Sequence, residues 1–273
     1  MPMTAANPVD AKTIADFGVQ WNVFPDNLGY YGSLDCLADI LGPLLDVREI
    51  AGCRVGDIGS GSGRIVNMLL DAKAAHVVAV EPSDAFTVLK RNTLDRADRA
   101  DRVELVHGTG EAIPASGDLD YVVSIGVLMC VVDPAPIIRA AWAALRPGGK
   151  LIVWLYGVEG NELYLSLANP LRAVTKRLPH PLLMGVVYPL SILCDGYGGL
   201  TRILPLPMRD YFRGHLRHLS PAQRRLTIYD QLNPTYVKYY RKEEAYQLLA
   251  ANGFRQVQLY HRHGYSWTVS GTK

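Results

Sequence analysis

The chain has 273 residues and a mass of 30.1 kDa, and 49% of its residues are hydrophobic and 20% charged. This composition supports a sizeable core and excludes a chain that is disordered throughout. Twenty-eight Lys and Arg against 26 Asp and Glu give a formal charge of +2, which argues against a dedicated nucleic-acid binder. The four cysteines form no CxxC pair, so the sequence predicts neither a disulfide framework nor a zinc site and fits the cytoplasm.

The chain shows no targeting signal, and we expect a soluble protein that makes at most peripheral contact with a membrane. Residues 1–15 lack the basic start and apolar centre of a secretory signal. The longest stretch without Asp, Glu, Lys or Arg covers residues 178–194 and contains three prolines. It is shorter than the ~20 apolar residues that span a bilayer.

The predicted elements divide the chain into four parts. Residues 1–50 carry aromatic residues and an apolar helical pattern, and are predicted to form an N-terminal helical cap. In residues 51–157 short runs rich in Val and Ile alternate with helix-like segments, which indicates a parallel sheet covered on both faces. The strands are predicted at CRVGDIG, HVVAVEP, VELVHG, YVVSIG and KLIVWLYG, and the helices at SGRIVNMLLDAK, SDAFTVLKRNTL and PAPIIRAAWAAL.

The pattern changes after residue 157. Residues 158–235 carry several prolines and apolar stretches that indicate helices, and we expect them to form a helical lid. Residues 236–273 are predicted to complete the core with the helix RKEEAYQLLAANGF, which ends at Gly253, followed by two strands around His263 and Gly264. An antiparallel hairpin would then close the sheet.

A glycine-rich loop follows the first predicted strand, in the sequence VGDIGSGSGR. Glycines at positions 59, 61 and 63 allow a tight turn and a close approach of the backbone to a ligand. A dinucleotide loop needs a third glycine where Arg64 stands, and a P-loop needs Lys followed by Ser or Thr. The loop therefore favours a ligand without a pyrophosphate. Glu81 ends the next predicted strand, 20 residues after Gly61, where a carboxylate can accept ribose hydroxyls.

Five motifs occur in a fixed order over about residues 50–157: DIGSGSGR, AVEPS, HGTGEAIP, DYVVSIGVLMCVVDP and LRPGGKLIVWLYG. In these motifs the chain resembles the Rossmann-like (class I) S-adenosylmethionine-dependent methyltransferases of small-molecule and glycan pathways. The resemblance implies an α/β fold with a sheet of about seven strands. The sheet would be mostly parallel with an antiparallel C-terminal hairpin, have helices on both faces and carry a helical lid insert. The implied cofactor is S-adenosyl-L-methionine, the product S-adenosyl-L-homocysteine, and no metal is expected.

The resemblance also implies roles for residues in these motifs. Asp57 and Gly59 would lie near the amino-acid part of the cofactor, and Glu81 would bind the ribose. Many relatives carry Asp where Thr109 stands, so contact with the adenine amino group would use the hydroxyl or backbone of Thr109. Trp21 lies in FGVQW, which resembles the lid entry of some members, and either covers the cofactor or packs in the core. The full predicted cofactor-binding set is Trp21, Asp57, Gly59, Ser60, Gly61, Gly63, Glu81, Pro82, Thr109, Gly110, Glu111 and the main chain of Ile125.

The acceptor leaves fewer marks in the sequence. Ser124-Ile125-Gly126-Val127 stands where methyltransferases of base amino groups carry Asn or Asp with Pro-Pro, so we expect transfer to oxygen. Met129 and Cys130 replace the two histidines of many small-molecule relatives. The remaining candidate bases are His261 and His263 on the final hairpin, Asp230, and tyrosines such as Tyr156 and Tyr240. We predict His261 and His263 as the catalytic bases, with a solvent-facing strand edge as their alternative. The predicted acceptor-side residues are Tyr156, Tyr229, Asp230, Tyr236, Tyr239 and Tyr240.

The insert is the most basic part of the chain. Residues 163–228 hold nine Lys or Arg and two acids, interleaved with apolar stretches. Three interpretations stay open: an ordinary lid with solvated arginines, a pocket for a large apolar or anionic acceptor, or a weak membrane-surface contact. RNA binding is disfavoured because the basic residues form no continuous stripe.

The sequence thus predicts a cytoplasmic S-adenosylmethionine-dependent methyltransferase that acts by in-line methyl transfer to oxygen. Its acceptor would be a small metabolite, a sugar or a lipid-like compound. Two alternatives stay open, a catalytically silent module that binds S-adenosylmethionine and a peripheral-membrane methyltransferase acting on a lipid-linked substrate. Arg64 disfavours a nicotinamide oxidoreductase. The oligomeric state is not predicted.

Overall fold

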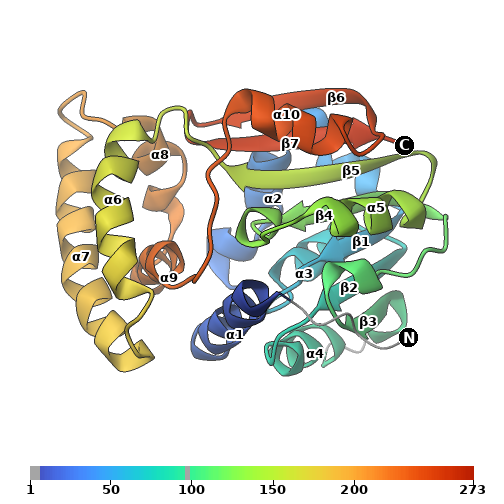
Figure 1. Ribbon diagram of the computed structural model, residues 1–273, viewed down its shortest axis with the longest axis horizontal. Coiled ribbons are helices and arrows are strands. Elements are labelled where there is room, and N and C mark those ends of the chain that lie inside the picture. Colours follow the sequence, from blue (N-terminus) through green and yellow to red (C-terminus); the bar gives the residue numbers. More distant parts are fainter. Residues whose placement is uncertain (1–6, 96–98) are drawn as a thin grey trace.

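A computed structural model of the chain describes residues 7–95 and 99–273, and its centre is one seven-stranded sheet (Figure 1). The strand order is β3-β2-β1-β4-β5-β7-β6. Strands β1 to β5 pair in parallel, whereas β7 is antiparallel to both β5 and β6. This arrangement confirms the predicted sheet and its closing hairpin. The strands are β1 (Arg54–Ile58), β2 (His76–Glu81), β3 (Val103–His107), β4 (Leu119–Ile125), β5 (Leu145–Tyr156), β6 (Arg255–Arg262) and β7 (Ser266–Thr272).

Helices cover both faces of the sheet, and a separate group of helices stands beside it (Figure 1). The first group is α1 (Pro8–Val23), α2 (Leu34–Leu41), α3 (Arg64–Asp71), α4 (Phe86–Leu94), α5 (Ala135–Ala144) and α10 (Lys242–Ala250). The second group, which we call the lid, is α6 (Glu162–Thr175), α7 (His180–Leu200), α8 (Arg209–Gly214) and α9 (Pro221–Leu232). The lid helices fall between residues 158 and 235, where helices were expected. The boundaries of the four predicted parts, 1–50, 51–157, 158–235 and 236–273, stay a prediction.

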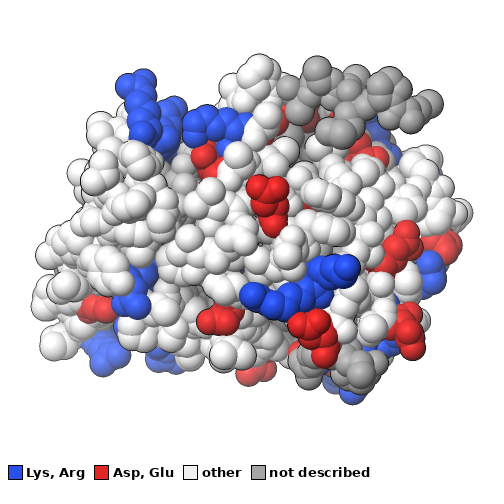
Figure 2. Space-filling view, turned by 90° about the horizontal axis from the view of Figure 1, so that it is seen from below, with Lys and Arg blue, Asp and Glu red and all other residues white. Residues whose placement is uncertain are grey.

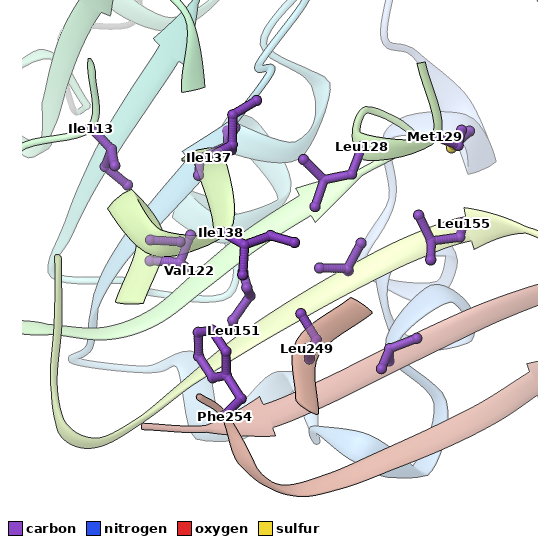
Figure 3. Close-up of a cluster of buried hydrophobic side chains, with 14 of the residues drawn as sticks. Ile113, Val122, Leu128, Met129, Ile137, Ile138, Leu151, Leu155, Leu249 and Phe254 are labelled. Carbon is purple, nitrogen blue, oxygen red and sulfur yellow. The ribbon is translucent and has the colours of Figure 1, made fainter. Parts of the chain in front are cut away.

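The sheet is buried on both sides, which explains its continuous Val and Ile runs. Successive residues of a strand face opposite sides, and in β2 Val78 and Val80 belong to one buried cluster while Val77 and Ala79 belong to the other. The cluster under α5 and α10 appears in Figure 3, where Ile138, Leu151, Leu249 and Phe254 lie close together. The other cluster packs beneath α2 and α3.

The lid has a small core of its own. Leu183 and Val187 of α7 pack with Tyr229 and Leu232 of α9, and Phe24 after α1 joins them. The ring of Phe24 lies 5.6 Å from that of Tyr229, centroid to centroid. The lid is therefore held against α1 by side-chain packing.

Helix α7 is longer than the charge-free stretch that the sequence shows. It has 21 residues and, among the described residues, it is the one helix whose length and composition would allow it to cross a membrane. Pro179 is its N-cap residue and Pro181 lies in its first turn, where a proline costs no hydrogen bond, and Pro189 lies inside it. The helix continues past Asp195 to Leu200, so the prolines do not end it.

Candidate cofactor and acceptor site

The glycine loop lies at the carboxyl edge of the sheet, between β1 and α3. The strand order reverses between β1 and β4, the position at which open α/β sheets bind ligands. Gly59, Gly61 and Gly63 have φ of +78°, +53° and +83°, which only glycine adopts easily. The amide of Gly59 donates to the carbonyl of Val80 over 2.8 Å, so the loop is tied to β2.

Glu81 fixes the same loop from the end of β2. Its side chain is buried, and Oε2 accepts a hydrogen bond from the Gly61 amide at 2.7 Å. Oε1 accepts from both the amide and the hydroxyl of Ser83. The carboxylate therefore has a fixed position at the loop.

Asp57 lies in β1 and is buried behind the loop. Its Oδ2 has no hydrogen-bond partner among the described residues, while the Ser60 hydroxyl donates to the Asp57 backbone carbonyl at 3.0 Å. Burial raises the pKa of Asp57 to about 7. A positively charged donor beside this oxygen would both satisfy it and favour its ionised form.

A cavity of about 1080 Å³ begins at the glycine loop and continues into the lid. Of the predicted cofactor-binding residues, those that line it are Trp21, Gly59, Glu81, Pro82, Thr109, Gly110, Glu111 and Ile125. Asp57, Ser60, Gly61 and Gly63 lie behind this surface. A Cβ on Gly61 would come within 2.9 Å of the indole nitrogen of Trp21, so Trp21 covers the loop directly. The Thr109 hydroxyl donates to the Glu111 carboxylate at 3.1 Å.

The lid end of the cavity holds a cluster of polar and aromatic side chains. The Tyr156 hydroxyl donates to Oδ2 of Asp230 at 2.6 Å, and the Gln20 amide donates to Oδ1 at 2.8 Å. Tyr239 stacks on Tyr156 with ring centroids 5.2 Å apart. Burial raises the pKa of Asp230 above its ordinary value. Tyr156, Asp230 and Tyr239, all predicted as acceptor-side residues, therefore meet in one wall of the cavity.

The other three predicted acceptor-side tyrosines lie elsewhere. The Tyr229 hydroxyl is 3.0 Å from Nδ1 of His180 within the lid core. Tyr240 is buried in the cluster under α5 and α10. Tyr236 lines a second, smaller cavity of about 240 Å³. These positions come from the helical and loop geometry of residues 221–240, which distributes the tyrosines over several directions.

Neither His261 nor His263 is among the described residues that line the large cavity. The ring of His261 stacks on Trp267 at 4.1 Å, and Nε2 of His263 lies 2.7 Å from Oδ1 of Asp39. Arg262, the last residue of β6, does line the cavity, and it shares Asp39 with His263. Its guanidinium is buried and forms an ion pair with Asp39.

Part of the chain matches a known protein family. Residues 57–151 match the protein family described as methyltransferase domain. The chain contains a methyltransferase domain. The match agrees with the resemblance to the Rossmann-like S-adenosylmethionine-dependent methyltransferases that the five motifs carry. Within the described residues, no group of three or more His, Cys, Asp or Glu residues is placed to hold a metal ion.

Two relatives match part of the chain. A tRNA U34 carboxymethyltransferase of Pseudoalteromonas translucida is 32% identical over 116 residues, which cover 42% of this chain and 36% of the relative. A ubiquinone biosynthesis O-methyltransferase of Aromatoleum aromaticum is 31% identical over 129 residues, which cover 43% of this chain and 54% of the relative. The chain thus spans about a third to a half of the length of these two relatives.

A solved structure shares the fold over more of the chain. The S-adenosylmethionine-dependent methyltransferase SibL superimposes with a TM-score of 0.53 and 18% identity, covering 88% of this chain and 55% of SibL. At this identity the similarity concerns the fold.

The methyltransferase domain offers groups that fit S-adenosylmethionine. Glu81 presents a carboxylate at the end of β2, where ribose hydroxyls would lie. The unpartnered oxygen of Asp57 is an acceptor suited to an ammonium group. Trp21 lies on the glycine loop as a cover. When bound, the cofactor supplies a methyl group on a positively charged sulfur.

Several cavity residues of this methyltransferase domain and its lid were not predicted. The Arg64 guanidinium lies 4.3 Å from the ring centroid of Tyr31 and donates to its backbone carbonyl. The ring nitrogen Nδ1 of His215 lies 3.1 Å from the buried Arg262, and burial together with this positive charge lowers the pKa of His215 to about 3. His215 is therefore neutral at physiological pH. No local pattern marks these residues, because their partners are distant in sequence.

Proposed function

We propose that the protein is a methyltransferase that transfers the methyl group of S-adenosylmethionine to an oxygen of a small, largely apolar or lipid-like acceptor. The observation that carries the proposal is the continuous cavity, which joins the glycine loop and Glu81 to the Tyr156–Asp230 pair in the lid. A cavity shared by a cofactor loop and a lid can hold two reactants in one enclosed space. Alignment of the reactants and exclusion of water are the main requirements of in-line transfer.

The cofactor end would use the groups already described. Glu81 binds the ribose hydroxyls, Asp57 and the loop lie toward the amino-acid part, and Thr109, Gly110 and Glu111 lie at the adenine edge. The main chain of Ile125 lies beside the methionine part. Trp21 excludes water from the loop by covering it.

The acceptor end would use Asp230 and Tyr156. Transfer to a hydroxyl requires the loss of its proton, and a carboxylate with a raised pKa is suited to accept a proton near neutral pH. The Tyr156 hydroxyl orients Asp230, and Tyr239 supports the Tyr156 ring by stacking. We assign no proton transfer to His261 or His263, because neither is among the described residues that line the cavity.

Oxygen as the methylated atom is supported by the ubiquinone biosynthesis O-methyltransferase among the relatives. A tRNA U34 carboxymethyltransferase is also among the relatives, so the choice of acceptor depends on the cavity lining of this chain. The lid end of this cavity is lined by aliphatic side chains such as Leu167, Leu171 and Leu190. Such a lining favours an apolar acceptor over a polynucleotide.

The first test is calorimetric titration of the purified protein with S-adenosylhomocysteine, with NADH as the control. Binding of S-adenosylhomocysteine alone is expected, and binding of neither compound would overturn the cofactor assignment. Methyl transfer is then measured with radiolabelled S-adenosylmethionine against hydroxylated lipid-like compounds, with RNA for comparison. Cofactor binding without transfer to any acceptor would favour the catalytically silent module.

The role of Asp230 is tested with Asp230→Asn and the matched control Asp210→Asn, which changes an exposed carboxylate on α8. We expect Asp230→Asn to lower kcat by roughly 100-fold or more while the affinity for S-adenosylhomocysteine stays the same. The control variant should behave as the unmodified protein does. Unchanged kcat in Asp230→Asn would remove Asp230 from the reaction.

A further inference from the structure

The lid exposes large apolar side chains along α6, α7 and the segment after α7. Eleven of the 19 exposed large hydrophobic residues of the described chain lie between residues 163 and 204. In Figure 2 the left end of the molecule, where α6 and α7 lie in Figure 1, is largely white, with charged side chains at its margins. We call this surface the apolar lid face and define it by its members that are at least 62% exposed, Leu163, Leu167, Val174, Ile192, Leu193 and Ile203.

Helix α7 shows that the exposure is one-sided. Leu183, Val187 and Ser191 are buried against α9, whereas Ile192 and Leu193 are 72% and 69% exposed. Only 17% of the most apolar 18-residue stretch of α7 is buried, so α7 does not pack as a core helix of a soluble domain does. It is also no free helix, because its one charged residue, Asp195, forms an ion pair with Arg224 of α9 at 2.6 Å. Such a helix is suited to lie along an apolar surface.

The charges around the apolar lid face indicate which kind of surface would bind to it. Of the nine Lys and Arg in residues 163–228, only Arg224 forms an ion pair with another described residue. Lys176 and Arg177 follow α6, and Arg202 follows α7, so positive charges border α7 at both ends. From the start of α6 to the end of α9 the lid has nine basic and four acidic residues, and the rest of the chain has 19 basic and 22 acidic residues, so the positive charge is concentrated on the lid. A second copy of the chain would bring the same positive charge to this face, whereas anionic lipid headgroups would neutralise it.

The cavity reaches the apolar lid face. Leu167 is 71% exposed and also lines the cavity. Leu171 of α6 and Leu190 of α7 line the cavity beside it. Leu167 therefore lies at the border between the cavity and the apolar lid face. We propose that the apolar lid face binds the surface of an anionic membrane and that a lipid-soluble acceptor enters the cavity from that membrane. The second part rests on the proposed function, whereas the first part does not.

The test is co-sedimentation of the full chain with vesicles, without cofactor or acceptor. Vesicles of phosphatidylcholine with phosphatidylglycerol should carry the protein into the pellet, and vesicles of phosphatidylcholine alone should carry much less. The variant Ile192→Glu/Leu193→Glu should bind the mixed vesicles at least about tenfold less, since it removes two large apolar contacts and adds negative charge. The matched control, Val19→Glu/Leu28→Glu, makes the same change at exposed positions in α1 and the loop after it, and should bind as the unmodified chain does.

The outcomes separate this inference from the proposed function. All three proteins should bind S-adenosylhomocysteine equally, which also shows that the variants are folded. Vesicle binding without S-adenosylhomocysteine binding would support the binding of a membrane by the apolar lid face and refute the methyltransferase function. Failure of the unmodified chain to bind mixed vesicles, or equal binding by both variants, would overturn the membrane surface. A concentration-dependent dimer in sedimentation velocity, absent in Ile192→Glu/Leu193→Glu, would instead give this face to a second copy of the chain and overturn the inference.

Discussion

Replacement of Glu81 by Gln tests the cofactor end of the site most directly. An ionised carboxylate has about four acceptor positions, and three of those on Glu81 are taken by the Gly61 amide and by the amide and hydroxyl of Ser83. One position is therefore left for a ribose hydroxyl. Loss of one hydrogen bond to a charged group costs about 1.5–3 kcal/mol, so affinity for S-adenosylhomocysteine should fall by roughly 10- to 150-fold.

The assay is calorimetric titration, with circular dichroism and a thermal melt to confirm that each variant is folded. Glu104→Gln is the matched control, because Glu104 lies on the neighbouring strand β3 and its partner is His76 at 3.6 Å. A folded Glu81→Gln variant with unchanged affinity would refute the ribose assignment. An equal loss in both variants would show that the effect of Glu81 is only a general effect of charge.

Three further substitutions test other parts of the site. Gly61→Val should lower the affinity for S-adenosylhomocysteine at least about tenfold, because Gly61 has φ of +53° and Trp21 leaves no room for a side chain. A calorimetric affinity equal to that of the unmodified chain would refute this. Asp57 has a pKa raised to about 7 in the fold from an ordinary 3.8, so its burial favours the protonated form and stability falls as pH rises from about 4 to 7. The free energy of unfolding of Asp57→Asn, measured by urea denaturation relative to the unmodified chain, should therefore rise by up to about 3 kcal/mol from pH 5 to pH 8. An equal difference at both pH values would contradict the assignment. Asp39→Asn should destabilise the fold by about 3–5 kcal/mol by leaving Arg262 buried without its partner. Burial raises the pKa of Asp39, but hydrogen bonds from His263 and Arg262 outweigh it and hold the pKa at about 2, so about 2 kcal/mol of this contribution should be lost as pH falls from about 4 to 2.

The sheet and the glycine loop could be predicted because their signals are local. The central strands are short runs of residues with both faces buried, so their composition alone marks them, whereas the edge strands β3 and β6 are only partly buried. The loop motif and Glu81 are separated by one strand–helix–strand unit, so their spacing is fixed by regular structure. The prediction of a helical lid had the same basis, since the proline-containing stretches keep a helical pattern.

The lid end of the site could not be predicted because its contacts join distant segments. Gln20 and Asp230 are 210 residues apart, and Arg262 and Asp39 are 223 apart. Alternation along β6 separates Arg262 from His261, whereas His263 follows the strand and shares Asp39 with Arg262. The sequence does not tell which face of this edge strand meets the cavity, so the two histidines were predicted as bases, and Arg262 and His215, which line the cavity, were missed.

Helix α1 connects the two ends of the site. On one side Trp21 covers Gly61, and on the other Gln20 donates to Asp230 while Asn233 donates to the Asp16 carbonyl at 2.9 Å. Any movement of α1 that uncovers the glycine loop must also release Asp230. Entry of the cofactor and the position of the proposed base would therefore be coupled through this one helix.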